Sequence, residues 1–277
     1  MNPLELLYEV EDIPSFDLPV ELGHLYGGLL GLAKPCLYTN FVSTIDGVVA
    51  IPSIPQSNAV INAGSEADRF VMGLLRAFAD VVLIGSGTLR SSPKGTWRPE
   101  KVFPPAAEAF KELRRRLGRA DAPAVAILTG SGSIDPAHPI LDSGALVLTS
   151  DSGAERLAGV LPSASTVVSL GEGPRLDPGV VVSALHEREH RLILSEAGPH
   201  TFGALLAAGV ADELFLTVSP LLAGDAGEGS RLRLVQAADL APDLVGGRLL
   251  SVRRSEAHLF LRYELNAPLS RRNTGPR

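Results

Sequence analysis

Nine short β-rich runs between residues 36 and 265 constrain the fold more than any other feature of the sequence. Helical patterns separate several of these runs, which is typical of βαβ units with parallel strands. The early runs are almost continuously apolar, as expected for strands buried on both faces of a sheet. The nine runs are Cys36–Val42, Asp80–Ile84, Ala124–Thr129, Ala145–Thr149, Thr166–Leu170, Arg191–Ser195, Glu213–Val218, Gly247–Arg253 and Ala257–Leu265.

Only Arg254–Glu256 separate the last two runs, so we predict that these two strands pair as an antiparallel hairpin. The predicted fold class is therefore α/β, with a mixed, mostly parallel sheet of about nine strands flanked by helices. A chain of 277 residues can form such a sheet as one large domain. We expect residues 36–265 to form it, residues 1–35 to be an N-terminal arm or short helix packed on it, and residues 266–277 to be a flexible tail.

Four segments have helical patterns. The clearest is Ser65–Phe78, whose apolar residues recur at i, i+4 and i+8 and whose first residues, Ser65-Glu66-Ala67-Asp68, resemble a capping box. A second, Pro199–Ala208, has proline in its first turn and Gly209 just after its end. The other two are Ala106–Leu117 and Pro178–Glu187.

Composition excludes several classes of function. The net charge of −6 is spread along the chain, so no basic surface for nucleic acid is expected. Acidic residues stand where a signal peptide needs positive charge, and no apolar run approaches the roughly 20 residues that cross a bilayer, so we expect a cytoplasmic protein. Cys36 lies in an apolar run and is predicted to be a buried thiol. The histidines are scattered without metal-ligand spacing, so no metal site is expected.

Three polar motifs follow predicted strands. In the first, Asn40-Phe41-Val42-Ser43-Thr44-Ile45-Asp46-Gly47, hydroxyls followed by a carboxylate can orient a polar ring, but an Asx turn explains the same residues. In the second, Ile84-Gly85-Ser86-Gly87-Thr88-Leu89-Arg90, small glycines let backbone amides approach a phosphate, although the motif equally suits a structural turn. The third glycine of a Rossmann fingerprint is absent from it.

The third motif is Leu192-Ile193-Leu194-Ser195-Glu196-Ala197-Gly198-Pro199-His200-Thr201, where a strand ends in a carboxylate and a glycine turn opens a helix. The free N–H groups at a helix N-terminus form an anion site, whereas the alternative is a capped helix with a solvent-facing glutamate. Because the carboxyl ends of parallel strands meet at one edge of a sheet, the three motifs together indicate a dinucleotide-binding cleft.

The motifs resemble one known family. Ser43-Thr44-Ile45-Asp46-Gly47 resembles the Ser-Leu-Asp-Gly motif of the pyrimidine reductases of riboflavin biosynthesis, the C-terminal domain of the bacterial bifunctional deaminase-reductase. The stretch from Ala67-Asp68-Arg69 to Thr88-Leu89-Arg90 is similar to that family's helix, strand and Gly-x-Gly-Thr turn. Ser195-Glu196-Ala197-Gly198-Pro199 and Ala211-Asp212-Glu213-Leu214 resemble its Glu-Gly-Gly-Pro and Asp-Glu-Leu blocks, and order and spacing agree over about residues 36–265.

The resemblance implies a dihydrofolate-reductase-like sheet that binds NADPH, usually as a homodimer, and reduces a ribosylamino-pyrimidine phosphate of the 5-amino-6-(5-phosphoribosylamino)uracil type at the sugar C1′. It implies catalytic roles for Asp46 and Glu196, and substrate contacts by Ser43, Thr44, Arg69 and Glu196. The cofactor-binding residues that it implies are Gly85, Ser86, Gly87, Thr88, Thr129, Ser131, Gly198, Pro199, His200 and Thr201.

Two departures from the family pattern bear on the substrate. Ser91-Ser92-Pro93 stands where the family places an acidic residue before a proline, and Ala197 replaces the first glycine of Glu-Gly-Gly-Pro. The zinc ligands of the preceding deaminase domain are missing from the chain. A close paralogue of the pyrimidine reductases, a dihydrofolate-reductase-type pterin reductase and a non-catalytic dimeric nucleotide-binding protein therefore stay open as alternatives.

Overall fold

The computed structural model describes residues 1–227, 229–242 and 244–265, so the predicted tail, residues 266–277, lies outside the described residues. Each of the nine predicted runs forms a strand, with ends that shift by two residues at most. The strands are β1 (Glu5–Glu9), β2 (Cys36–Ser43), β3 (Val48–Ala50), β4 (Val81–Gly85), β5 (Ala124–Thr129), β6 (Leu146–Thr149), β7 (Thr166–Ser169), β8 (Leu192–Ser195), β9 (Glu213–Val218), β10 (Leu232–Arg233), β11 (Gly247–Ser255) and β12 (His258–Leu265).

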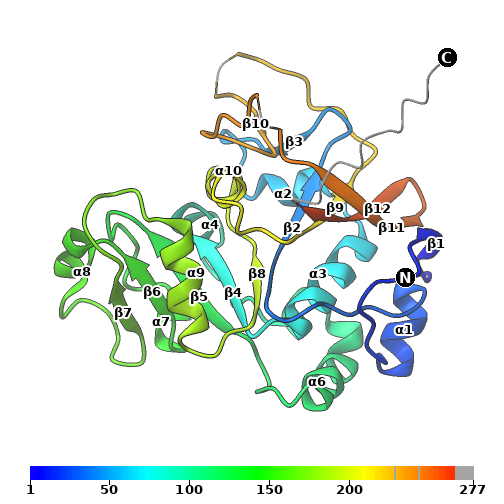
Figure 1. Cartoon of the computed structure of the whole chain (residues 1–277), viewed down its shortest axis with the longest axis horizontal. Helices are drawn as coiled ribbons and strands as arrows, with labels where there is room; N and C mark the ends of the chain where they lie inside the picture. The colour runs from blue at the N-terminus through cyan, green and yellow to red at the C-terminus, as the bar shows by residue number, and fades with distance from the viewer. Residues whose placement is uncertain (228, 243, 266–277) are drawn as a thin grey trace, which may run out of the picture.

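Ten of the strands in the described residues form one sheet in the order β1-β11-β12-β9-β2-β8-β4-β5-β6-β7 (Figure 1). From β9 to β7 all neighbours are parallel, which agrees with their apolar sequences. The predicted hairpin of β11 and β12 is antiparallel and adds to the sheet through β9. The mixed, mostly parallel sheet predicted from the sequence is therefore confirmed.

The predicted helices are also present. Ser65 caps α3 as predicted, because its side-chain oxygen accepts a hydrogen bond from the Asp68 N–H at 3.2 Å. Gly209 follows α10 with a φ of +66°, a left-handed conformation that favours glycine. The helices are α1 (Val20–Tyr26), α2 (Ser57–Ile61), α3 (Glu66–Phe78), α4 (Ser86–Ser91), α5 (Pro99–Val102), α6 (Ala107–Arg116), α7 (Pro139–Asp142), α8 (Asp151–Leu157), α9 (Pro178–His186) and α10 (Pro199–Ala207).

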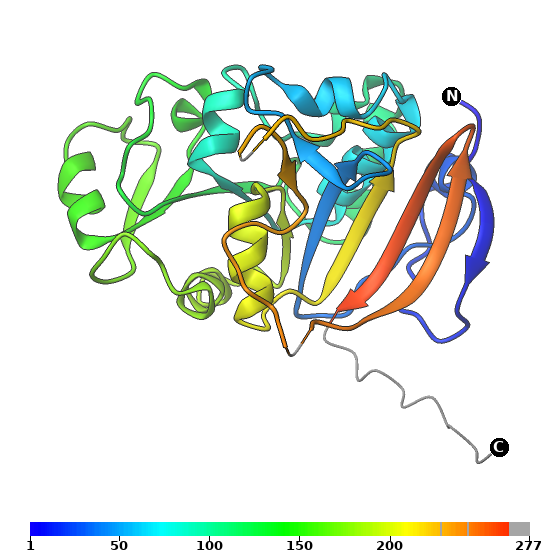
Figure 2. The ribbon, with the colours of Figure 1, turned by 90° about the horizontal axis from the view of Figure 1, so that it is seen from above.

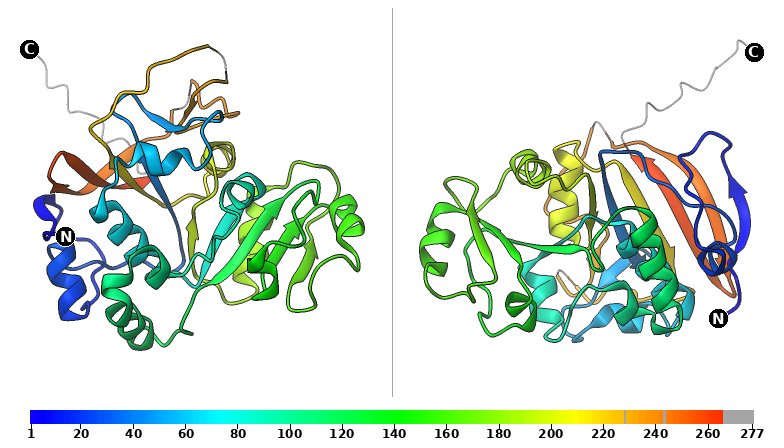
Figure 3. Two further views of the ribbon diagram at one scale, coloured as in Figure 1. Left: turned by 180° about the vertical axis from the view of Figure 1, so that it is seen from behind. Right: turned by 90° about the horizontal axis from the view of Figure 1, so that it is seen from below.

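Helices cover both faces of the parallel part of the sheet. On one face, α1, α3 and α6 pack through residues such as Leu22, Leu74 and Phe110. On the other, α9 and α10 pack through residues such as Leu185 and Phe202, and Figures 2 and 3 show these helices on the opposite side of the strands. Cys36 on β2 is buried as predicted, and burial raises the pKa of its thiol.

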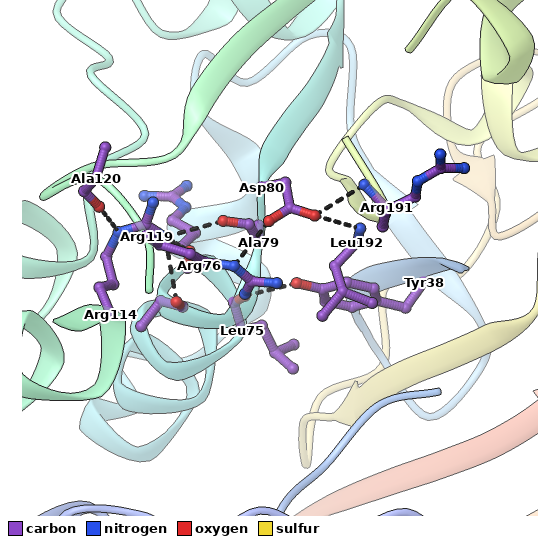
Figure 4. A network of polar contacts seen from close by, with 11 residues as sticks. Tyr38, Leu75, Arg76, Ala79, Asp80, Arg114, Arg119, Ala120, Arg191 and Leu192 are labelled. Atoms are coloured by element: carbon purple, nitrogen blue, oxygen red, sulfur yellow. Dashed lines mark hydrogen bonds and ion pairs between the residues drawn. The ribbon is translucent and has the colours of Figure 1, made fainter. Parts of the chain in front are cut away.

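A polar network holds the C-terminal end of α3 against the amino ends of β4 and β8 (Figure 4). Asp80 accepts hydrogen bonds from the N–H groups of Arg191 and Leu192 and pairs with Arg119 at 2.7 Å. Arg114 on α6 donates to the carbonyl of Ala77, in the last turn of α3, and to that of Ala79, just after the helix. This network fixes the direction of α3, which carries three side chains of the site described below.

Residues 5–9 form a strand that sequence reasoning did not predict. β1 pairs with β11 at the edge of the sheet, and its Glu9 forms an ion pair with the buried Arg253 at 2.7 Å (Figure 2). The guanidinium of Arg253 also lies 3.9 Å from the centre of the Tyr26 ring on the α1 side. Next to it, Arg262 on β12 and Glu213 on β9 form a second buried ion pair.

Candidate functional site

A cleft of about 880 Å³ opens at the carboxyl ends of β4 and β8, where the sequence predicts a ligand site. One wall is α3, and the base is formed by β2 and by the turns that lead into α4 and α10. Figure 1 shows α4 and α10 beside each other at this end of the strands. The predicted residues that line the cleft are Gly85, Ser86, Gly87, Thr88, Glu196, Gly198, Pro199, His200 and Thr201.

The two glycine-containing motifs lie side by side in the cleft. A Cβ atom at Gly85 would come within 3.7 Å of Thr201 Oγ1, and the Thr88 hydroxyl donates to the carbonyl of Glu196 at 3.4 Å. The predicted glycine turn is short, because α4 begins at Ser86. The end of β4 and the end of β8 therefore form one continuous surface.

The N-terminus of α10 provides the part of that surface best suited to an anion. Gly198 is its N-cap and supplies no side chain to bond the first N–H groups of this nine-residue helix, and Pro199 occupies the first turn. A Cβ atom at Gly198 would meet no atom within 4 Å, so the backbone here faces open space. These residues fit a phosphate-bearing ligand such as a dinucleotide.

Glu196 and Arg76 form an ion pair in the lining of the cleft. The guanidinium of Arg76, in the last turn of α3, donates two hydrogen bonds to the Glu196 carboxylate, at 2.8 and 2.6 Å. Their side chains are only 11% and 10% exposed. Such a bidentate pair fixes the direction of the carboxylate. Sequence reasoning identified Glu196 but missed Arg76, which lies 120 residues earlier in the chain.

Asp46 lies outside the residues that line the cleft. It accepts hydrogen bonds from the N–H groups of Ala223 and Gly224 and from the Thr44 hydroxyl, and thereby joins the β2–β3 turn to the segment after β9. The Thr44 hydroxyl and then these backbone donors lower the pKa of Asp46 to about 2. Ser43 and Thr44 are themselves buried, at 4% and 2% exposure.

Three further candidates also lie apart from the cleft lining. Arg69 points to the surface, where it contacts Glu66 at 3.7 Å and the Gly64 carbonyl at 3.4 Å. Thr129 is buried at the end of β5, and Ser131 is exposed and accepts from the Ser133 N–H.

The cleft includes polar residues that sequence reasoning did not propose as site residues. They are Asp68 and Arg76 on α3, which lie eight residues apart with the apolar Met72 between them, and Asn40 on β2. The capping box accounts for the backbone N–H of Asp68 but not for its side chain. The signal that could have identified the site is the eight-residue spacing of Asp68 and Arg76, which places both side chains on one face of the helix.

The described residues hold neither a metal-ligating cluster nor a membrane-spanning helix. They contain no group of three or more His, Cys, Asp or Glu side chains arranged to hold a metal ion. Within the same residues, no helix combines the length and apolar character needed to cross a bilayer.

The fold and the cleft define an α/β protein with a nucleotide-sized site at the carboxyl ends of its parallel strands. The chain belongs to the RibD C-terminal domain family, whose sequence model matches residues 35–245. No curated protein matches the chain.

Solved structures share its fold. A pyrimidine reductase-like protein from Corynebacterium diphtheriae is 21% identical with a TM-score of 0.64, and the match covers 90% of this chain and 95% of that one. RibD from Acinetobacter baumannii is 19% identical with a TM-score of 0.62 over 88% of this chain and 60% of that one. The riboflavin biosynthesis reductase Rib7 of Saccharomyces cerevisiae is 12% identical with a TM-score of 0.56 over 86% and 93%. These structures share the mixed, mostly parallel α/β fold class predicted from the sequence.

Proposed function

We propose that the chain is an NADPH-dependent reductase of a ribosylamino-pyrimidine phosphate, of the 5-amino-6-(5-phosphoribosylamino)uracil reductase type in riboflavin biosynthesis, or a close paralogue. Membership of the RibD C-terminal domain family supports a reductase of this pathway. The observation that carries the proposal is the Arg76–Glu196 pair, which lines the cleft together with the two glycine-containing turns. A carboxylate held in a fixed direction beside a phosphate-binding surface is what a reductase needs to orient a polar substrate.

In this proposal the cofactor lies along the ends of β4 and β8. Gly85, Ser86, Gly87 and Thr88 hold one part of it and the residues 198–201 at the start of α10 hold its diphosphate. When bound, NADPH supplies a hydride and leaves as NADP⁺. The reduction adds that hydride to C1′ of the ring-opened imine and a proton to the imine nitrogen. Thr129 and Ser131 keep their proposed place near the adenosine end.

Glu196 accepts hydrogen bonds from the hydroxyl groups of the substrate sugar. Arg76 holds the carboxylate in place, so that it does not need to reorganise when the substrate binds. The resemblance implies a catalytic role for Asp46, but Asp46 lies outside the cleft lining, so we propose a positioning role in its place, in which Asp46 holds the segment at Ala223 and Gly224. Ser43 ends β2 and Thr44 begins the turn that carries Asp46, and both remain proposed substrate contacts, as does Arg69 at the outer rim.

The direct test measures NADPH consumption by the purified protein with three partners: the ribosylamino-uracil phosphate, its 2-amino-pyrimidinone counterpart and dihydrofolate. We expect turnover with one of the two pyrimidines and none with dihydrofolate, and higher kcat/KM with NADPH than with NADH. Turnover with dihydrofolate alone would identify a pterin reductase. Tight NADPH binding without turnover on any partner would identify a nucleotide-binding protein that does not catalyse the reaction.

We also propose that the protein works as a cytoplasmic homodimer. Apolar side chains stay exposed on the antiparallel part of the sheet, including Leu6 and Tyr8 on β1 and Leu259 on β12, at 44%, 47% and 37% exposure. A second copy of the chain would cover these residues.

A further inference from the structure

The face of α3 that borders the cleft extends well beyond the Arg76–Glu196 pair. Asp68, Met72 and Arg76 all line the cleft, and eight residues of helix place the two ends of this face about 12 Å apart. Arg76 stands at the end near the glycine-containing turns. Asp68 therefore stands at the far end, away from the surface suited to phosphates.

Asp68 is a buried carboxyl group, and burial makes its charged form unfavourable. It is 3% exposed, and no cation of the described residues lies within ion-pair distance of it. Its Oδ2 accepts a hydrogen bond from the Asn62 side chain at 3.3 Å, and the Thr217 hydroxyl also bonds to it. These two hydrogen bonds, His258 on β12 and Arg69 on its own helix all favour the charged form of Asp68, but burial outweighs them and raises the pKa of Asp68. A buried carboxyl that opens into a large cleft is typical of a functional group.

A carboxamide lies close to this carboxyl. Asn40 faces the α3 side of the sheet from β2, and its register partner on β9 is Phe215, two residues before Thr217. Asn40 and Thr217 line the same small cavity, and Asn40 also lines the cleft. Within the described part of the chain, the half-buried Asn40 side chain makes no hydrogen bond, so its N–H and C=O groups are free for a ligand.

We propose that Asp68, with Asn40 beside it, binds the lactam edge of the substrate ring, accepting from a ring N–H and donating to the adjacent C=O. This inference rests on the proposed function, because it assigns the far end of the same cleft to the pyrimidine. A neutral carboxyl group and a lactam each offer one donor and one acceptor side by side, so they form a matched pair. At the N3–H and C2=O edge, where a uracil offers this pair, a 2-amino-4-oxopyrimidine offers two adjacent donors instead, its N3–H and its 2-amino group, which an ionised carboxylate would match. Asp68 is thus the residue that sets which ring the enzyme accepts.

The test compares the binding of two ring probes by calorimetry in the presence of NADP⁺: 6-(ribitylamino)uracil and 2-amino-6-(ribitylamino)pyrimidin-4-one. The parent is expected to bind the uracil probe more tightly. Asp68→Asn keeps one donor and one acceptor, so its affinity for the uracil probe should stay within about three-fold, whereas Asp68→Ala should weaken it at least about ten-fold. Affinity for NADP⁺ should be unchanged in both variants.

Asn62→Ala is the matched control, because it removes the same hydrogen bond from Asp68 without touching the cleft lining. If Asp68 were only structural, Asn62→Ala and Asp68→Ala would lower the melting temperature alike and leave probe affinity alone, and that result would overturn the inference. Tighter binding of the 2-amino probe by the parent, with loss of that binding in Asp68→Asn, would also overturn the lactam pairing. A parent that binds NADP⁺ but neither probe would refute the pyrimidine substrate itself, and the inference with it.

Discussion

At the scale of single residues, the site depends on a pair of charges from two elements. Arg76 belongs to the last turn of α3 and Glu196 follows β8, and their bidentate contact joins the wall of the cleft to its base. Both side chains are nearly buried, so neither is solvated well enough to lose its partner without cost. The pair therefore links the geometry of the site to the stability of its surroundings.

We predict that Glu196→Gln lowers turnover at least about ten-fold while NADPH affinity changes little, because the variant keeps the shape of the side chain and removes its charge. Its melting temperature should fall less than that of Arg76→Met, because the Gln carbonyl can still accept a hydrogen bond from the Arg76 guanidinium. Arg76→Met should lower turnover similarly and also reduce the melting temperature, since it leaves the Glu196 carboxylate unpaired. Steady-state kinetics and thermal unfolding measure both effects. Arg115→Met is the control, because Arg115 pairs with Glu112 at the surface with 74% exposure. Parental turnover in Glu196→Gln would show that the pair serves structure alone.

At the scale of elements, the turn between β2 and β3 illustrates a carboxylate that acts through backbone contacts. The hydrogen bonds to Asp46 favour its charged form and lower its pKa to about 2 from the ordinary value of 3.8. Because the pKa of Asp46 is lower in the folded than in the unfolded state, its ionised carboxylate stabilises the folded protein at any pH above the unfolded value of 3.8. This contribution is lost as the pH falls from about 4 towards 2.

Asp46→Asn is therefore expected to melt at a lower temperature than the parent at pH 6, and the difference should shrink as the pH falls towards 2. Thermal unfolding at a series of pH values measures it. Asp12→Asn, at an exposed carboxylate of the N-terminal segment, should melt with the parent at every pH. A constant difference between Asp46→Asn and the parent would mean that the charge of Asp46 does not hold the turn.

The strands β9 and β12 are joined by the buried pair of Glu213 and Arg262, whose side chains are 9% and 2% exposed. Burial raises the pKa of Glu213 even though the Arg262 guanidinium opposes that change. We predict that Arg262→Met lowers the free energy of unfolding by about 3–5 kcal/mol, because it leaves a buried carboxylate unpaired. Arg248→Met removes an exposed pair with Glu264 on β11 and β12 and should cost at most about 1 kcal/mol in the same urea titrations. If Arg262→Met and Arg248→Met lowered the free energy of unfolding equally, the buried pair would contribute no more to stability than the exposed one, and the prediction would be wrong.

Most helices and strands could be predicted from their own apolar patterns. The elements and site residues that depend on contacts between distant segments could not. β2 and β9 were recognised because apolar residues dominate them, whereas β1 is a five-residue strand with exposed side chains that forms by pairing with β11. The same holds for the site. The strand-end rule located Glu196. The spacing of Asp68 and Arg76 places both on one face of α3, but no local pattern specifies that this face forms a wall of the cleft.

At the scale of the whole molecule, the antiparallel part of the sheet stands at one end, away from β7 at the other, and β12 exposes Leu259 there (Figure 2). We predict that light scattering returns a mass of about 58 kDa, which is twice the 29.1 kDa of one chain. Leu259→Lys should shift the protein towards the monomer mass. Val20→Lys, at an 88% exposed residue of α1, should not. A parental mass near 29.1 kDa would reject the homodimer.

The order of strands also decides when the sheet can assemble during synthesis. The bond between Leu37 on β2 and Asp212 spans 175 residues, and the pair of Glu9 and Arg253 spans 244. At about 5–20 residues per second, a ribosome exposes β2 on the order of ten to thirty seconds before β9 emerges. For most of that interval β2, an apolar strand of the future core, has both edges unpaired, so the nascent chain is expected to bind chaperones. Slower growth at low temperature should therefore raise the soluble yield only if the chaperones remain active enough to protect this strand.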